Sequence, residues 1–191
     1  MKCTPCLAWG GLAATMLLAS CGPQLTTTTV PMSSVAVSKG DGSLAGTIHA
    51  QVNSFRSSVG RKQVSRHAGL DKMAQQHSEF MRMNRGKFGS GSAGSLTHYG
   101  FEERALKAQR MMSMSEVGEN IATCSRQGSN AVPVLVNAWK NSSAHMKNMK
   151  GDWDVTGIGV SVDSDGTVFA TQIFANEDHS HMTMTDRMRQ F

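Results

Sequence analysis

The chain has 191 residues, a formal net charge of +5 and a charged-residue content of only 17%. So small and scattered a charge argues against nucleic acid as a partner. The length suits one domain with a single hydrophobic core.

The N-terminus has the pattern of an export signal. Lys2 precedes a mostly apolar run over residues 7–18, and small residues lead from there to Cys21. The run is shorter than the roughly 20 residues that a membrane-spanning helix needs. Leu18-Ala19-Ser20-Cys21 resembles a bacterial lipobox, which predicts removal of residues 1–20 and acylation of Cys21 with chains such as palmitate. The alternative is an ordinary secretory signal in which Cys21 stands at the cleavage site by chance.

The residue after Cys21 is Gly22 and not Asp. In lipoproteins of Gram-negative bacteria this resemblance implies transfer to the outer membrane. Residues 21–43 are rich in Thr, Ser, Pro and Gly, which predicts a flexible tether. Cys3 and Cys6 leave with the signal and Cys21 carries lipid, so Cys124 has no partner for an intrachain disulfide.

Three helices are predicted in the first half of a domain that spans residues 44–175. Apolar residues at helical spacing predict the first helix, which stops at Gly60. A second set of apolar residues at helical spacing predicts another helix, with Asp71 as its N-cap and its end at Gly86. Glycine and serine then predict a loop up to Gly100, followed by a helix over residues 101–112. The two stripes consist of Leu44, Ile48, Val52, Phe55 and Val59, and of Leu70, Met73, Ala74, His77, Phe80 and Met81.

The second half of the domain changes from helical to strand periodicity. Residues 117–123 have strand composition, and Asn130 is the predicted cap of a helix that runs through Trp139. Residues 155–162 and 167–174 are predicted strands, joined at Asp165-Gly166 by a hairpin turn. Residues 176–191 are polar and have no apolar residues at regular helical spacing, which predicts a loosely ordered tail.

Five short motifs occur in the order found in the CAP superfamily, also called the SCP domain, and resemble its bacterial branch. The resemblance covers residues 48–175 and implies an α/β fold, a three-layer α/β/α sandwich with a small antiparallel sheet. The motifs are Ala74-Gln-Gln-His77-Ser78-x-x-Met81, Thr97-His98, Glu116-Val-Gly-Glu119-Asn120-Ile-Ala122, Trp139-x5-His145, and Gly157-Ile-Gly-Val with Thr171-Gln-Ile-Phe174.

The resemblance also implies a cleft in which two histidines and two acids hold a divalent metal such as Zn²⁺. His98 matches the first histidine and Glu119 the acid of the Gly-Glu-Asn motif. Ser142 replaces the second acid of plant and animal members and Phe169 their second histidine, while His145 is the histidine of the bacterial branch. The predicted metal ligands are therefore His98 and His145, fewer than the three or four that zinc needs. The predicted supporting residues are His77, Glu116, Asn120 and Ser142.

Several of these residues also have a structural interpretation. His77 lies on an apolar stripe, where a buried histidine bonded to backbone is favoured over a ligand. Glu119 can hydrogen-bond the loop that contains His98 instead of taking part in chemistry. His179-Ser-His181 can chelate a metal, although a solvated tail is the favoured interpretation.

The sequence has no Gly-x-Ser-x-Gly, His-Glu-x-x-His or P-loop motif, so no standard hydrolase centre is indicated. Most CAP proteins act as binding, effector or lipid-carrying modules, and the resemblance therefore favours a membrane-tethered binding module over an enzyme. The expected ligands are a lipid, a sterol-like molecule or a cell-wall component. The alternative is a metal-assisted peptidase or cell-wall hydrolase that uses His98, Glu119 and His145.

Overall fold

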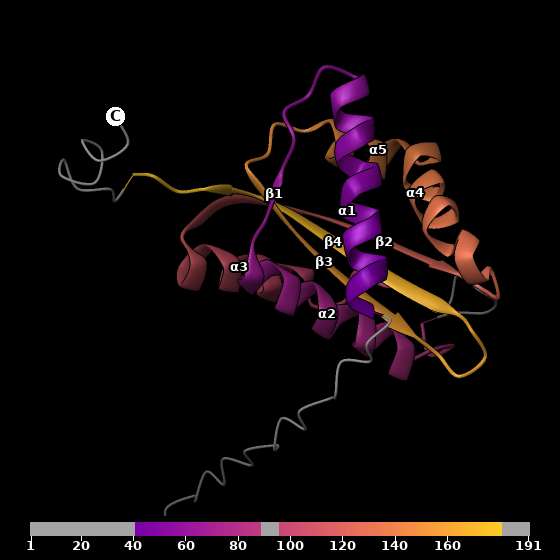
Figure 1. Ribbon diagram of the computed structural model, residues 1–191. Helices are drawn as coiled ribbons and strands as arrows, with labels where there is room; N and C mark the ends of the chain where they lie inside the picture. The colour runs from indigo at the N-terminus through magenta and orange to yellow at the C-terminus, as the bar shows by residue number, and fades with distance from the viewer. Residues whose placement is uncertain (1–40, 89–95, 181–191) are drawn as a thin grey trace, which may run out of the picture. The chain divides into compact units, whose positions relative to one another are not determined.

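A computed structural model describes residues 41–88 and 96–180 of the chain (Figure 1). Its centre is a four-stranded sheet in the order β1-β3-β4-β2. The strands are β1 (Ser65–Arg66), β2 (Met114–Cys124), β3 (Val155–Val162) and β4 (Val168–Glu177). β2, β3 and β4 pair antiparallel, as predicted, and the two-residue β1 adds a parallel pairing to β3. The predicted signal peptide, Cys21 and most of the predicted tether lie outside the described residues.

Helices cover both faces of this sheet, which confirms the predicted three-layer sandwich. One layer contains α1 (Asp41–Ser58), α4 (Ala131–Asn141) and α5 (Ser143–Lys150), and the other contains α2 (Ala68–Met83) and α3 (Phe101–Met112) (Figure 1). The 3-10 turn η2 (Gly128–Asn130) leads into α4. Each interface has its own apolar core, because the strands are buried on both faces. The cores are built around Ile48, Leu135, Trp139 and Phe174 on one face and Leu70, Met73, Ala74 and Ile173 on the other.

Two glycines in β3 bring α2 into direct contact with the strand. A Cβ on Gly157 or Gly159 would stand 2.1 Å from the main chain of Leu70 or Gln75. This close approach lets α2 side chains bond the outer edge of β3 where β1 has ended. Gln75 donates to Val160 O and accepts from Val160 N, both at 2.9 Å. The helix thereby satisfies main-chain groups that would otherwise stay unpaired at a sheet edge.

The structure corrects two of the predicted helix caps. The N-cap of α2 is His67, whose side chain accepts from Leu70 N, and not Asp71. Asp71 instead accepts from Arg66 Nε at 2.6 Å and from Ile158 N at 2.9 Å, so its carboxylate joins the helix to the sheet. Asn130 precedes α4 as predicted but makes no side-chain capping bond.

The structure also contains elements that the sequence did not predict. α5 and β1 are both new, β2 begins at Met114, and β4 runs to Glu177. The polar C-terminal segment therefore starts after the strand, two residues later than predicted. Within residues 41–88 and 96–180, no helix is both long enough and apolar enough to cross a membrane. Cys124 is a buried free thiol, and burial raises its pKa, as is typical of an unreactive cysteine.

Candidate functional site

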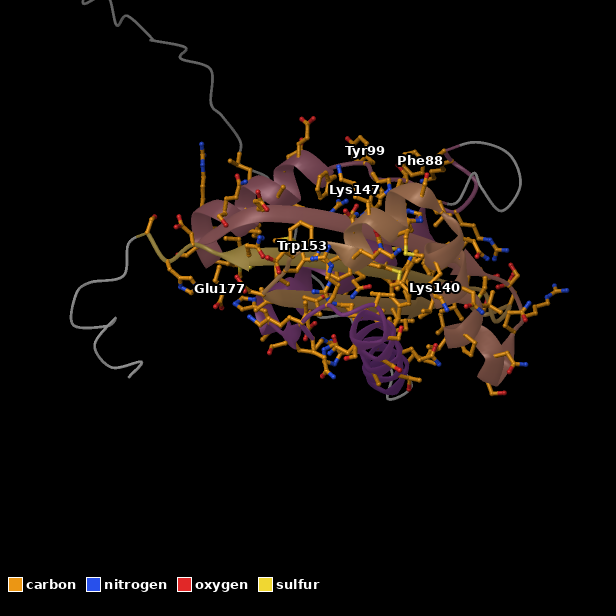
Figure 2. The ribbon with its side chains drawn as sticks, turned by 90° about the horizontal axis from the view of Figure 1, so that it is seen from above. Phe88, Tyr99, Lys140, Lys147, Trp153 and Glu177 are labelled. Atoms are coloured by element: carbon orange, nitrogen blue, oxygen red, sulfur yellow. The ribbon has the colours of Figure 1, made fainter. Side chains whose placement is uncertain are left out.

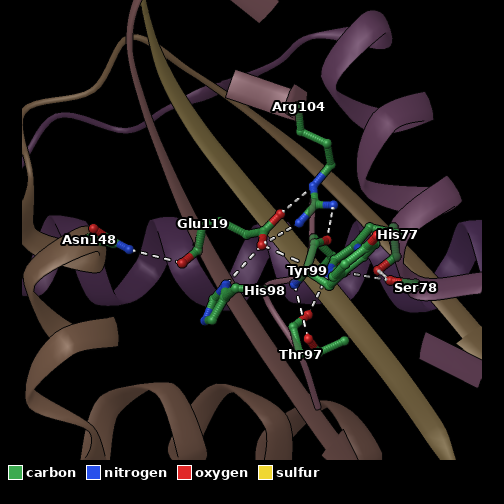
Figure 3. Close-up of polar contacts among 10 residues, drawn as sticks. His77, Ser78, Thr97, His98, Tyr99, Arg104, Glu119 and Asn148 are labelled. Carbon is green, nitrogen blue, oxygen red and sulfur yellow. Dashed lines mark hydrogen bonds and ion pairs between the residues drawn. The ribbon is translucent and has the colours of Figure 1, made fainter. Parts of the chain in front are cut away.

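A buried carboxylate lies at the centre of the candidate site. Glu119 is in the middle of β2, and its side chain is only 1% exposed. Arg104 of α3 donates to both carboxylate oxygens, from Nε at 2.9 Å to Oε2 and from Nη2 at 2.8 Å to Oε1 (Figure 3). His98 Nδ1 lies 2.9 Å from Oε1. Glu119 is thus held by a bidentate guanidinium and one imidazole, the strongest arrangement available to a carboxylate.

These contacts decide the charge of Glu119. Burial acts to raise the pKa of this carboxyl group, but hydrogen bonds from His98 and Arg104, with the positive charge nearby, lower the pKa by more. The net pKa of Glu119 lies below its ordinary value, so the side chain is ionised at neutral pH. An ionised carboxylate only accepts hydrogen bonds, so His98 donates from Nδ1 and its Nε2 atom is left for other partners.

The structure brings His98 and His145 together from distant parts of the chain. Their ring centroids are 6.4 Å apart, with His98 in the segment before α3 and His145 on α5. His98 is half exposed, whereas the Nδ1 atom of His145 is buried without a hydrogen-bond partner. Burial lowers the pKa of His145, and the neighbouring His98 lowers it further, so His145 is neutral at neutral pH. The two imidazoles therefore lie close together, although their segments are distant in the chain.

Hydrogen bonds to β2 fix the position of α5. Ser142 is the N-cap of this helix, and its side chain accepts from His145 N at 3.4 Å. Asn120 is fully buried and donates to His145 O at 3.2 Å. Asn148, which sequence analysis did not single out, donates to Glu119 O at 3.1 Å and to Asn120 Oδ1 at 2.9 Å. Ser142 and Asn120 thus support the site by holding the helix that carries His145.

His77 has the structural role that its place on an apolar stripe predicted. It is buried, and its Nε2 donates to Thr97 O at 2.8 Å, which anchors the segment that carries His98 (Figure 3). Burial lowers the pKa of His77 more than the charge of Glu119 raises it. Because His77 is therefore neutral, its 3.8 Å approach to Glu119 Oε1 is not an ion pair.

An open cavity of about 300 Å³ lies beside this network, between α2 and the start of α3. His77, Phe80 and Tyr99 form a column of nearly parallel rings in its wall, with successive centroids 6.0 and 5.7 Å apart. Tyr99 is 65% exposed and lies beside Phe88 (Figure 2). Polar and charged side chains complete the lining, among them Gln76, Glu103, Arg104 and Lys107.

One expected site residue, Glu116, lies elsewhere, and so does the residue that replaces the family's second histidine. Glu116 is exposed and accepts from Asn176 Nδ2 at 3.2 Å, so it supports the end of the sheet and not the cleft. Phe169, in the place of the family's second histidine, is fully buried in a small core with Met81 and Ile121. The position that could have held an imidazole therefore belongs to the interior.

The residues present do not fit a zinc centre. Both oxygens of Glu119 are bonded to Arg104, His98 Nδ1 is bonded to Glu119, and His77 Nε2 is bonded to Thr97. Across residues 41–88 and 96–180, no group of three or more His, Cys, Asp or Glu side chains is placed to hold a metal ion. Zinc sites in proteins take at least three such ligands.

The fold and the site together define a CAP-type domain with a histidine-carboxylate cleft. The family model of the cysteine-rich secretory proteins (CAP) matches residues 49–174, and the chain belongs to this family. A search of curated protein sequences finds no match.

Solved structures of bacterial proteins have the same fold. An outer surface protein from Borrelia burgdorferi superposes with a TM-score of 0.58 at 18% identity, over 71% of this chain and 94% of that one. An extracellular SCP-domain protein from Bacillus anthracis gives 0.53 at 23% identity, over 72% of this chain. A cysteine-rich secretory protein from Staphylococcus aureus gives 0.53 at 17% identity, over 74% of this chain. This chain spans only 41% of each of the last two.

Proposed function

We propose that this protein is an exported binding module, anchored to a membrane by lipid on Cys21, that holds its ligand in the cleft beside Glu119. The observation that carries the proposal is that both carboxylate oxygens of Glu119 are already bonded, Oε2 to Arg104 and Oε1 to Arg104 and His98. A carboxylate that acts as a general base needs a free oxygen within reach of the proton it takes. A carboxylate with both oxygens bonded and a lowered pKa is suited to fixing the cleft's shape instead.

The cavity favours a polar segment of a cell-wall polymer as the ligand. Its volume of about 300 Å³ is at the lower end of small-molecule sites. Gln76, Glu103 and Lys107 at the rim are unfavourable neighbours for a sterol or an acyl chain, which need a larger apolar enclosure. An exposed aromatic ring such as Tyr99 offers a flat apolar face beside hydrogen-bonding groups, and a sugar with its amide substituents presents the same combination.

The experiment is cosedimentation of the full chain with purified peptidoglycan sacculi, with the release of soluble fragments measured in the same samples. We expect the chain to bind sacculi without releasing fragments, and Tyr99→Ala to weaken binding. Met111→Ala is the matched control, because Met111 is 73% exposed on α3 and does not line the cavity. Binding to phospholipid vesicles alone would point to a lipid ligand instead.

The runner-up function is the metal-assisted peptidase or cell-wall hydrolase that uses His98, Glu119 and His145. It predicts release of fragments that chelators abolish and that Glu119→Gln removes. That outcome would overturn the binding-module proposal, because a binding module catalyses no reaction. The donor set disfavours it, since Glu119 is already fully bonded.

The anchor is tested separately. Wild-type protein expressed in a Gram-negative host should label with a fatty-acid analogue and fractionate with the outer membrane, whereas Cys21→Ser should do neither. Cys124→Ser is the control, because Cys124 is buried in the folded domain. Equal membrane retention of Cys21→Ser and wild type would contradict the lipid anchor. The solved structures of a surface and an extracellular protein with the same fold support an exported location.

A further inference from the structure

Arg104 lies where a metal ion would have to bind. A cation shared between Glu119 and the neighbouring imidazoles would need an oxygen of Glu119 that does not already face a positive charge. Arg104 instead places Nε and Nη2 at 2.9 and 2.8 Å from the two oxygens, so each oxygen already faces a positive charge. The planar fork of an arginine matches the two oxygens of a carboxylate, which suits it to this place.

The rest of the arrangement depends on the same guanidinium. Arg104 Nη1 also donates to Tyr99 O at 2.8 Å, so a single side chain ties α3, the segment that carries His98, and β2 together. Its side chain is 15% exposed and Glu119 only 1% exposed, so water screens the pair weakly. The charge that stabilises the buried carboxylate is therefore supplied by the chain itself.

We propose that Arg104 is a built-in cation that replaces the divalent metal of the cleft, so that this CAP domain works without a metal and excludes zinc from Glu119. Removal of the guanidinium leaves Glu119 with His98 Nδ1 at 2.9 Å from Oε1, and the ring centroid of His145 lies 6.4 Å from that of His98. One carboxylate and two imidazoles form the three-ligand set that zinc prefers. The identity of residue 104 thus decides whether the cleft is a metal site.

The test is a competition titration of the full chain with Zn²⁺ against a chromophoric chelator at pH 7.5. We expect wild type to show no zinc binding that depends on His98. Arg104→Met, which keeps the length and loses the charge, should bind zinc at least about tenfold more tightly, and Arg104→Met with His98→Ala should lose that gain. Arg110→Met is the matched control, because Arg110 is an exposed arginine on the same helix and should leave zinc binding unchanged.

A folded Arg104→Met protein that binds no more zinc than wild type would overturn the proposal. If this variant fails to fold, wild type decides the question by thermal unfolding with EDTA and with excess Zn²⁺. A ligand that binds only the folded state raises its melting temperature. We expect the same melting temperature in both conditions, and stabilisation by zinc that His98→Ala removes would refute the inference. The inference rests on the geometry of Glu119 and not on the cleft's ligand, so it can fail while sacculus binding stands.

Discussion

Arg104 and Glu119 meet side on, with Nε and Nη2 of the guanidinium against the two carboxylate oxygens, although they lie 15 positions apart in the chain and belong to different layers of the sandwich. A charged pair in such a place stabilises the fold only while both partners are present. Loss of one partner from a buried pair costs about 3–5 kcal/mol, because the other charge is left without compensation.

The first prediction concerns Glu119→Gln. This variant leaves Arg104 uncompensated and should lose about 3 kcal/mol of unfolding free energy at pH 7, measured by urea denaturation. It should also have a flatter pH dependence in acid. The pKa of Glu119 is lowered in the folded state, so its stabilisation is present above the ordinary value of 4.5 and is lost as the pH falls through the lowered pKa. A variant that loses stability as steeply as wild type below pH 4.5 would contradict this assignment.

The second prediction concerns His77 and pH. The folded-state pKa of His77 is lowered by burial, so its unfolded form binds a proton first as the pH falls below the ordinary value of 6.5. Stability should therefore decline from there down to the lowered pKa. His77→Gln keeps a donor for Thr97 O and does not titrate, so it should cost about 1 kcal/mol at pH 7.5 and reduce the decline. Urea denaturation at several pH values measures both effects, and an unchanged slope would assign the decline to His145 instead.

The third prediction concerns the contact between α2 and β3. Gly159→Ala places a Cβ 2.1 Å from Gln75 N, where main-chain atoms cannot move aside, so about 3 kcal/mol or more of unfolding free energy should be lost. Gly46→Ala is the control, because Gly46 is exposed on α1 and has nothing within 4 Å of the added Cβ. It should gain about 0.5–1 kcal/mol from helix propensity. Equal effects of the two substitutions would show that the close approach does not restrict position 159.

The fourth prediction concerns the cap of α5. Ser142→Ala removes the side-chain acceptor for His145 N, and loss of such a cap typically costs about 1 kcal/mol. Ser142→Asp restores an acceptor and should recover most of the loss in chemical denaturation. If Ser142→Ala were as stable as wild type, the cap would not be what holds the start of the helix that carries His145.

Periodicity predicts the helices and the hairpin because these elements bury one face or both. The stripe from Ile48 to Phe55 and the nearly continuous burial of β3 and β4 are direct consequences of the two cores. Periodicity does not reveal α5, because it has eight residues, only one of which is buried, Met149. A two-residue strand such as β1 has no period at all. Asp71 opens an apolar stripe and so has the pattern of an N-cap, but Arg66 and the β3 main chain compete for its carboxylate.

The motifs draw attention to His98, Glu119 and His145, which lie close together in the structure. The partners of Glu119 can be anticipated only in kind: a glutamate in a buried strand needs a compensating cation. Which cation does so depends on how α3 lies against β2, and sequence spacing does not contain that information. Sequence analysis misses Arg104 and Asn148 for this reason, and Arg104 changes the interpretation of the whole cleft.

The two hydrogen bonds between Gln75 and Val160 also bear on how this protein behaves among many copies of itself. A sheet edge with free main-chain groups can pair with another chain, and that pairing is the usual start of aggregation. In this protein a single amide side chain occupies those groups in the middle of β3. Resistance to self-association at this edge therefore depends on α2 staying docked. Gly157 and Gly159, which allow α2 to approach β3, therefore protect this edge from pairing with another chain as well as shaping the fold.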